Sequence, residues 1–223
     1  MSFAEVFVQA IPRLLNGLIV TFYMTAFAAI FGLLFGTLLC VWRVYANKVV
    51  SFLSTTFIEL IRGTPMLVQL FILYYGLPVY GIRFSPLVAA LIGFTMNSAA
   101  YQAEYIRGAI QSIGSGQMRA ALSIGMSKWQ AVRLIILPQA LRRVIPAWTN
   151  EFIYLLKYTS MAYIIGAPEM MAQAKFIASR NFEFFKVYLI TALIYLTVVW
   201  ISSFFFAWLE RKLRIPGTVV GER

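Results

Sequence analysis

The feature that most constrains the fold of this chain is a long uncharged run, residues 14–42, near its start. The run exceeds the roughly 20 apolar residues that cross the hydrocarbon core of a bilayer, so it predicts a transmembrane helix that is tilted or overlong. It is also too long for the core of a signal peptide, and we expect no cleavage. Gly32 and Gly36 are small residues one turn apart that would permit close contact with another helix.

Composition places the rest of the chain in the same class of protein. Of its 223 residues, 61% are hydrophobic and only 12% are charged, unlike the composition of a soluble domain. We therefore expect an all-α, polytopic membrane protein that forms a single domain over residues 1–223. The apolar segments predict about five transmembrane helices, at residues 14–42, 64–80, 86–110, 136–156 and 187–209.

Charge is distributed between these apolar segments rather than gathered on one surface. The chain has 19 Lys and Arg residues against 8 acidic residues, and no His. A nucleic-acid-binding protein would need a basic folded surface, so we expect no nucleic-acid partner. An N-terminus outside and a C-terminus in the cytoplasm put most basic residues at or near the cytoplasmic side, as the positive-inside rule favours. These are Arg43, Lys48, Arg62, Arg107, Arg119, Lys128, Arg133, Arg142, Arg143, Arg211, Lys212, Arg214 and Arg223.

The longest polar interval, residues 116–140, interrupts the apolar pattern. It contains three basic residues and no acidic residue, which predicts a cytoplasmic loop. Its local pattern is helix, turn and helix, because Gly125 can adopt the left-handed conformation that ends a helix. A second helix would start directly afterwards with a capping box between Ser127 and Gln130.

The same interval resembles the EAA loop of the inner-membrane permease subunits of ABC importers. The family pattern is Glu-Ala-Ala, three residues, Gly, nine residues and Ile-x-Leu-Pro, and this spacing is kept at Arg119, Ala120, Ala121, Gly125, Ile135, Leu137 and Pro138. The resemblance implies that residues 111–135 form a cytoplasmic coupling loop, which docks in a cleft of an ATPase subunit through Arg119, Ala120, Ala121, Gly125 and Pro138. An ordinary basic loop between helices is the alternative.

Arg119 stands where the family has its leading glutamate. The spacing is intact, but any salt bridge that the family makes through this acid would be absent. Because like charges repel, we expect the ATPase surface that meets Arg119 to offer an acidic or neutral partner.

A second resemblance begins at ELIRGTP, residues 59–65. This segment and the apolar run that follows it to YYGLP resemble the permeases of the polar amino acid uptake family, and the resemblance covers essentially the whole chain. It implies a permease subunit in the cytoplasmic membrane of a bacterium or archaeon. Its partners would be a second permease subunit, two ATPase subunits and an external substrate-binding protein, which together work by alternating access. The alternative for ELIRGTP is a plain interfacial turn with an exposed pair between Glu59 and Arg62.

Polar residues within the predicted spans are candidates for the substrate path. Asn97, Tyr101 and Glu104 recur at helical spacing in the third span, so they share one face. Asn150 and Glu151 lie in the fourth span, where a carboxylate could bind the ammonium group of an amino acid. We expect substrate binding by Asn97, Tyr101, Asn150 and Glu151. The structural alternatives are pairs of Glu104 with Arg107, and of Glu151 with Arg142 or Arg143.

Other functional classes are disfavoured by what the sequence lacks. It has no glycine-rich phosphate loop, and it has neither the His nor the Asp residues of a metal site or catalytic triad. We therefore expect this chain to be no enzyme itself and to bind no metal or cofactor, with ATP and Mg bound by the partner ATPase subunits. An ion-coupled secondary transporter or a channel subunit is the competing class. Such a protein would need paired intramembrane charges and often inverted repeats.

Overall fold

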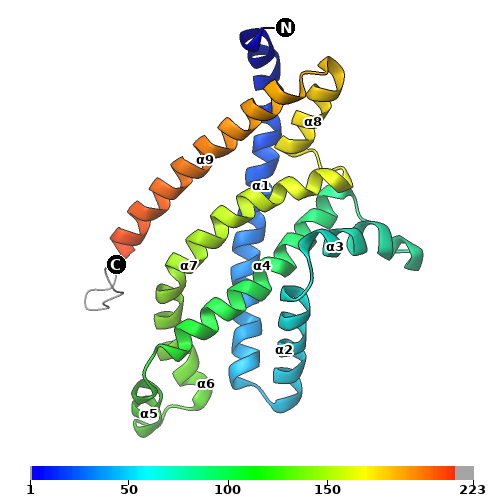
Figure 1. The fold of residues 1–223 in the computed structure, drawn as a ribbon. Coiled ribbons are helices and arrows are strands. Elements are labelled where there is room, and N and C mark those ends of the chain that lie inside the picture. Colours follow the sequence, from blue (N-terminus) through cyan, green and yellow to red (C-terminus); the bar gives the residue numbers. More distant parts are fainter. Residues whose placement is uncertain (1, 214–223) are drawn as a thin grey trace.

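The computed structural model describes residues 2–213, and within this range every regular element is helical (Figure 1). The expectation of an all-α fold is therefore confirmed. Arg214, Arg223 and a polar tail expected from Pro216 lie outside the described residues.

Helix α1, Phe3–Tyr45, is the longest element of the described chain. It contains the whole predicted span, residues 14–42, begins well before it and continues through Pro12. Its first turn is held by a capping box in which the Ser2 side chain accepts from the Glu5 N–H and the Glu5 carboxylate accepts from the Ser2 N–H. The early turns are also buried against α8 and α9, which favours helix where local sequence alone did not indicate it.

The second apolar region is a helix broken in the middle. Helix α2, Lys48–Arg62, ends at Gly63, and α3, Met66–Phe71, starts after Pro65, as the Gly-Thr-Pro step predicts. The axis turns by 105° between Lys48–Arg62 and Met66–Tyr80. Two short irregular helices follow α3, the π-helix Ile72–Gly76 and the 3-10 helix Leu77–Tyr80.

Helices α4, Pro86–Gln111, and α7, Leu137–Tyr158, cross the middle of the molecule (Figure 1). Between them lies the interval with the basic loop, which forms α5, Ser115–Ser123, α6, Lys128–Ala131, and a π-helical stretch, Val132–Ile136. Helix α7 continues through Pro146.

The last three elements begin at the end of the molecule that is remote from α5 and α6. The first two lie at that end, and the third runs back along the molecule. A 3-10 helix, Thr159–Ile165, leads to α8, Met170–Asn181, which lies beside the start of α1 (Figure 1). Helix α9, Phe184–Leu213, then runs away from the N-terminus.

The closest packing in the fold joins α1 to α4 through the predicted pair of small residues. A Cβ atom built on Gly32 would stand 2.4 Å from the Ser98 Oγ, and one on Gly36 would stand 2.7 Å from the Ala99 carbonyl oxygen. Neither distance is possible for a real side chain, so only glycine permits this approach. The small-residue pair thus makes the helix contact that the sequence suggested.

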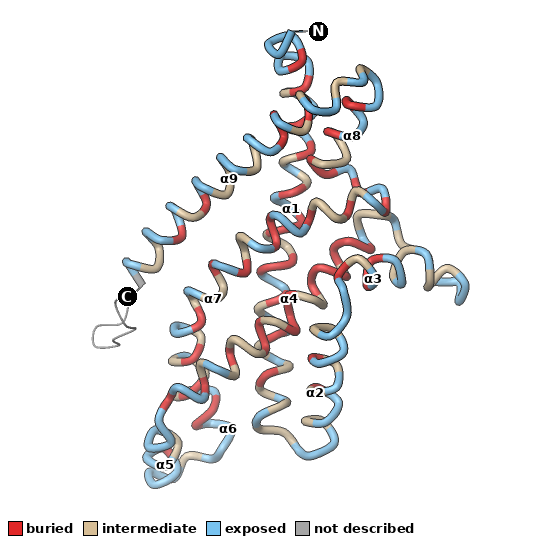
Figure 2. Tube along the Cα trace, in the orientation of Figure 1, coloured by how far each residue is buried: buried red, intermediate tan, exposed pale blue. Residues whose placement is uncertain are grey.

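Buried side chains form three apolar clusters along the long axis, and outward-facing residues of α1 and α9 are exposed (Figure 2). The cluster at the N-terminal end joins α1, α8 and α9. The middle one joins α1, α3 and α4, and the third joins α1, α2, α4 and α7. Their central members are Val6, Met170 and Ile190; Met24, Leu70 and Phe94; and Cys40, Ile58 and Ile106.

Exposed apolar helices identify a multi-pass membrane protein. By length and apolar composition together, two described helices could cross a bilayer, Phe3–Tyr45 and Phe184–Lys212, and the bent pair of α2 with Met66–Tyr80 would make a third. Helices α4 and α7 have 26 and 22 residues and carry the polar side chains described next. Five spans therefore remain a prediction.

Candidate functional site

A buried amide closes the break between α2 and α3. The Gln69 Nε2 donates to the carbonyl oxygens of Ile61 and Thr64 at 2.7 and 3.0 Å. Its Oε1 accepts from the Nδ2 of Asn97 at 3.4 Å. Backbone carbonyls freed at a helix break need such partners, above all inside a membrane. Asn97, one of the predicted site residues, thus links α4 to the broken helix.

One turn further along α4, two tyrosines connect a guanidinium to a buried carboxylate. The Cζ of Arg62 lies 5.4 Å from the ring centroid of Tyr101, and the rings of Tyr101 and Tyr105 are 6.5 Å apart. The Tyr105 hydroxyl donates to the Oε2 of Glu151 at 3.4 Å. Glu151 on α7 is only 6% exposed. The structure therefore brings Tyr101 and Glu151 into one chain of contacts.

Asn150 does not join this chain. It is exposed, whereas its neighbour Glu151 is buried against α4. Adjacent residues of an α-helix point about 100° apart, so one face cannot hold both side chains. Of the four predicted residues, the structure groups Asn97, Tyr101 and Glu151 along α4 and sets Asn150 apart.

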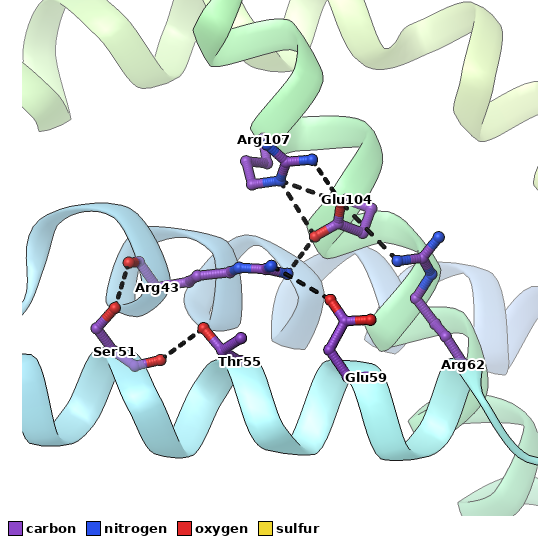
Figure 3. Close-up of polar contacts among 7 residues, drawn as sticks. All are labelled: Arg43, Ser51, Thr55, Glu59, Arg62, Glu104 and Arg107. Atoms are coloured by element: carbon purple, nitrogen blue, oxygen red, sulfur yellow. Dashed lines mark hydrogen bonds and ion pairs between the residues drawn. The ribbon is translucent and has the colours of Figure 1, made fainter.

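Five charged residues form an ionic cluster where α1 ends beside α2 and α4 (Figure 3). Glu104 accepts hydrogen bonds from Arg43 and Arg107, the latter at 2.7 and 3.0 Å. Glu59 accepts from Arg43 at 3.2 Å, and an Nη atom of Arg62 lies 3.9 Å from Glu104. The structural alternative for Glu104, a pair with Arg107, is confirmed. Glu59 pairs with Arg43 and not with Arg62, the partner in the structural alternative for ELIRGTP.

No ion pair within residues 2–213 joins Glu151 to an arginine. Arg143 instead donates to the backbone and side-chain oxygens of Ser112 at 2.7 and 2.8 Å, and Arg142 is exposed. The structural alternative for Glu151 is therefore wrong for the described chain. A buried carboxylate without a cation is costly, so Glu151 has the capacity to bind one.

The loop between α4 and α7 forms the predicted helix, turn and helix. Gly125 has φ +85°, and the N–H groups of Gly125 and Met126 donate to the carbonyls of Leu122 and Ala121 at 3.0 and 3.1 Å. These two hydrogen bonds form the Schellman motif, which ends a helix. The capping box of Ser127 with Gln130 is present as predicted.

The loop exposes four of the five predicted docking residues: Arg119, Ala120, Gly125 and Pro138. The fifth, Ala121, is only 4% exposed. The outer surface also carries large apolar side chains that the sequence reasoning did not single out. These are Leu122, Ile124, Trp129 and Leu134, with Ile124 78% exposed.

The sequence reasoning also missed three residues of the α4 chain of contacts: Arg62, Gln69 and Tyr105. Tyr105 follows Tyr101 by one turn, and Gln69 is a lone polar residue in an apolar run, so both left a signal. For Arg62, the sequence carried no signal except its position just before the helix break.

Comparison with known proteins gives a consistent result. Residues 28–215 match the family described as "Binding-protein-dependent transport system inner membrane component". The probable amino-acid permease protein YxeN of Bacillus subtilis is 43% identical over 95% of this chain and 96% of that protein. The glutamine transport system permease protein GlnP of Escherichia coli K12 is 36% identical over 92% and 95%.

Solved structures show the same architecture. A "Crystal structure of an amino acid ABC transporter with histidines" matches with a TM-score of 0.87 and 35% identity, over 95% of this chain and 99% of that one. The MetNI methionine ABC transporter, in inward facing conformations, matches with a TM-score of 0.71 over 96% and 100%. Its 23% identity shows a common fold alone.

Proposed function

The chain belongs to the family of binding-protein-dependent transport system inner membrane components, and from this membership we infer that it is a permease subunit of an ABC importer for polar amino acids. The observation that carries the inference is identity of 36 to 44% to amino-acid permeases over at least 92% of this chain. Alternating access is the mechanism: the helices expose a central site first to one side of the membrane and then to the other.

An importer of this kind needs an ATPase and a substrate-binding protein. We propose two ATPase subunits, a second permease subunit of the same or a homologous chain, and an external binding protein. ATP and Mg would be bound by the ATPase subunits, so this chain would not be an enzyme. The loop from α5 to α6 supports the proposal, because its exposed Ile124 and Trp129 beside Arg119 offer an apolar and basic surface for a partner.

The polar residues of α4 and α7 are the proposed substrate path. Glu151 is a buried carboxylate held by a long hydrogen bond from Tyr105, so the ammonium group or a cationic side chain of an amino acid can take it as a partner. Asn97 and Tyr101 line the same face of α4 beside the helix break. Asn150 remains a proposed contact only for a substrate or partner on the opposite side of α7.

The orientation is proposed from charge. With the N-terminus outside and the C-terminus cytoplasmic, α5 and α6 face the ATPase, and α8 lies outside, where a binding protein would dock. The structure supports this arrangement, because the N-terminus and α8 lie at the opposite end of the molecule from α5 and α6 (Figure 1).

Reconstitution tests the proposed function. The chain would be placed in proteoliposomes with its ATPase and binding protein, and uptake of radiolabelled L-glutamine, L-histidine and L-arginine measured. We expect uptake only with all components and ATP on the ATPase side, and none with a hydrolysis-deficient ATPase. Uptake by the chain alone under an ion gradient would instead establish the competing class, a secondary transporter or channel.

A further inference from the structure

Arg62 is the least well paired guanidinium of the ionic cluster, which holds three arginines and two glutamates. Arg43 donates to both carboxylates, and Arg107 makes three hydrogen bonds to Glu104. The nearest approach of Arg62 to Glu104 is 3.9 Å, beyond hydrogen-bond distance. The cluster therefore carries one excess positive charge, and Arg62 is where it is least compensated (Figure 3).

The Nε of Arg62 is also buried and has no hydrogen-bond partner among the described residues. A guanidinium presents five N–H donors, and a buried donor of a charged group is costly to leave unpaired. Glu104 is already occupied by the other two arginines. An anion from outside the chain would satisfy the free donors of Arg62.

The position of Arg62 identifies which anion. It is the last residue of α2, at the 105° bend, and its guanidinium faces the ring of Tyr101. Tyr101 leads to Tyr105, and Tyr105 donates to the buried carboxylate of Glu151. A positive group and a negative group thus lie at the two ends of a pair of tyrosines on one face of α4.

We propose that Arg62 binds the carboxylate of the transported amino acid, while Glu151 binds its ammonium group or cationic side chain. The proposal rests on the proposed function and adds a residue that determines specificity. A guanidinium binds a carboxylate through two parallel hydrogen bonds, which an ammonium ion cannot reproduce. The face of Tyr101 helps to hold the guanidinium in place. A ligand that lacks either charged end loses one of the two contacts.

Pairs of ligands that differ only in the carboxylate test the assignment. The purified complex of permease and ATPase would be used without the binding protein, because the binding protein makes its own selection. The probes are L-arginine with agmatine, L-histidine with histamine, and L-glutamine with 4-aminobutanamide. For at least one pair, we expect the amino acid to bind at least about tenfold more tightly than the decarboxylated amine, from the usual strength of charged hydrogen bonds.

The Arg62→Gln variant should remove most of this preference, because it weakens binding of the amino acid and leaves binding of the amine nearly unaffected. Arg62→Lys keeps the positive charge but loses the paired N–H donors of the guanidinium, so it should retain only part of the preference. Glu151→Gln acts at the other end, so it should weaken both members of a pair and preserve their ratio. Size-exclusion chromatography and thermal stability confirm that each complex assembles.

Arg142→Gln is the control, because it removes an exposed positive charge outside the cluster and leaves Glu104 occupied by Arg43 and Arg107. It should keep the wild-type preference for the carboxylate. An assembled Arg62→Gln complex with the wild-type preference would overturn the role of Arg62 and leave the proposed function standing. A wild-type complex that binds no probe, yet shows ATP-dependent uptake of a different solute, would overturn the amino acid substrate and this inference with it.

Discussion

At the scale of single residues, a buried carboxylate that is not paired with a cation makes the stability of the protein depend on pH. Glu169, just before α8 and outside the predicted spans, is fully buried, and its carboxylate accepts from the N–H groups of Met171 and Ala172 at 2.8 and 2.7 Å. The Tyr195 hydroxyl adds a bond at 3.3 Å. Glu169 therefore ties α8 to α9 at the end of the protein that holds the N-terminus.

Burial raises the pKa of Glu169 to about 7, against roughly 4.3 for an exposed glutamate. The folded protein thus holds this proton more tightly than the unfolded chain does. Stability from this group is fully present below pH 4 and is lost as pH rises through 7. We expect the melting temperature of the purified protein to fall between pH 5 and pH 8, and Glu169→Gln to reduce that fall. Glu5→Gln, at an exposed carboxylate, is the control and should leave the fall unchanged.

The residues of the proposed site show why sequence reasoning finds part of a site and not its partners. Asn97 and Tyr101 were visible because polar side chains at helical spacing are rare in an apolar span. The contacts around them were not visible. The residues that make those contacts are far apart in sequence: Tyr105 and Glu151 by 46 positions, and Arg43 and Glu104 by 61. Asn150 was grouped with Glu151 because they are adjacent in sequence, but the helix turns them to different sides.

At the scale of elements, the contact of α1 with α4 depends on having no side chain at two positions. We expect Gly36→Ala to destabilise the protein by about 1 to 3 kcal/mol, the usual cost of overpacking, because the new methyl group would meet the Ala99 carbonyl. Thermal unfolding in detergent measures this cost.

Gly108→Ala is the matched control within α4. Nothing lies within 4 Å of a Cβ at this position, so alanine should be neutral or slightly stabilising there. Equal melting temperatures for the two variants would contradict the close α1–α4 packing described above.

The proposed coupling loop, residues 111–135, makes a second prediction at this scale. Gly125 at φ +85° is in the left-handed region, which costs most residues about 1 to 2 kcal/mol and a β-branched residue more. Gly125→Val should leave the protein in the membrane but separate ATP hydrolysis from transport. Gly125→Asn should behave like the wild type, because asparagine tolerates this conformation. Uptake per ATP hydrolysed is the measurement, and a normal ratio in the valine variant would remove Gly125 from coupling.

Elements were predictable from sequence where a local signal fixes them. Ser127 with Gln130, the glycine at 125 and the Gly-Thr-Pro step mark ends of helices through their own chemistry, and each stands where the sequence placed it. Pro12 and Pro146 carry an equally local signal, yet both lie inside helices. Packing against other elements decided those two cases, which no single segment of sequence contains.

At the scale of the whole molecule, the orientation in the membrane can be tested directly. Cys40 is buried at 1% exposure and should not react, so single cysteines can be introduced at exposed serines. With a membrane-impermeant maleimide, we expect Ser179→Cys in α8 to be labelled on intact cells. Ser123→Cys in the coupling loop should be labelled only after the membrane is opened. The reverse pattern would invert the proposed topology.

The length of α1 has a thermodynamic consequence. Its 43 residues make a rod of about 65 Å, longer than the ~40–45 Å of a bilayer with its headgroups. One end lies beside α8, and the other presents Arg43 to the ionic cluster near the helix break. A continuous helix cannot tilt at one end alone. A partner bound at the outer end of α1 and a partner bound at its inner end therefore act on the same tilt angle. If each proposed partner favours one tilt of α1, their binding free energies are linked, and each changes the affinity of the other by the same factor.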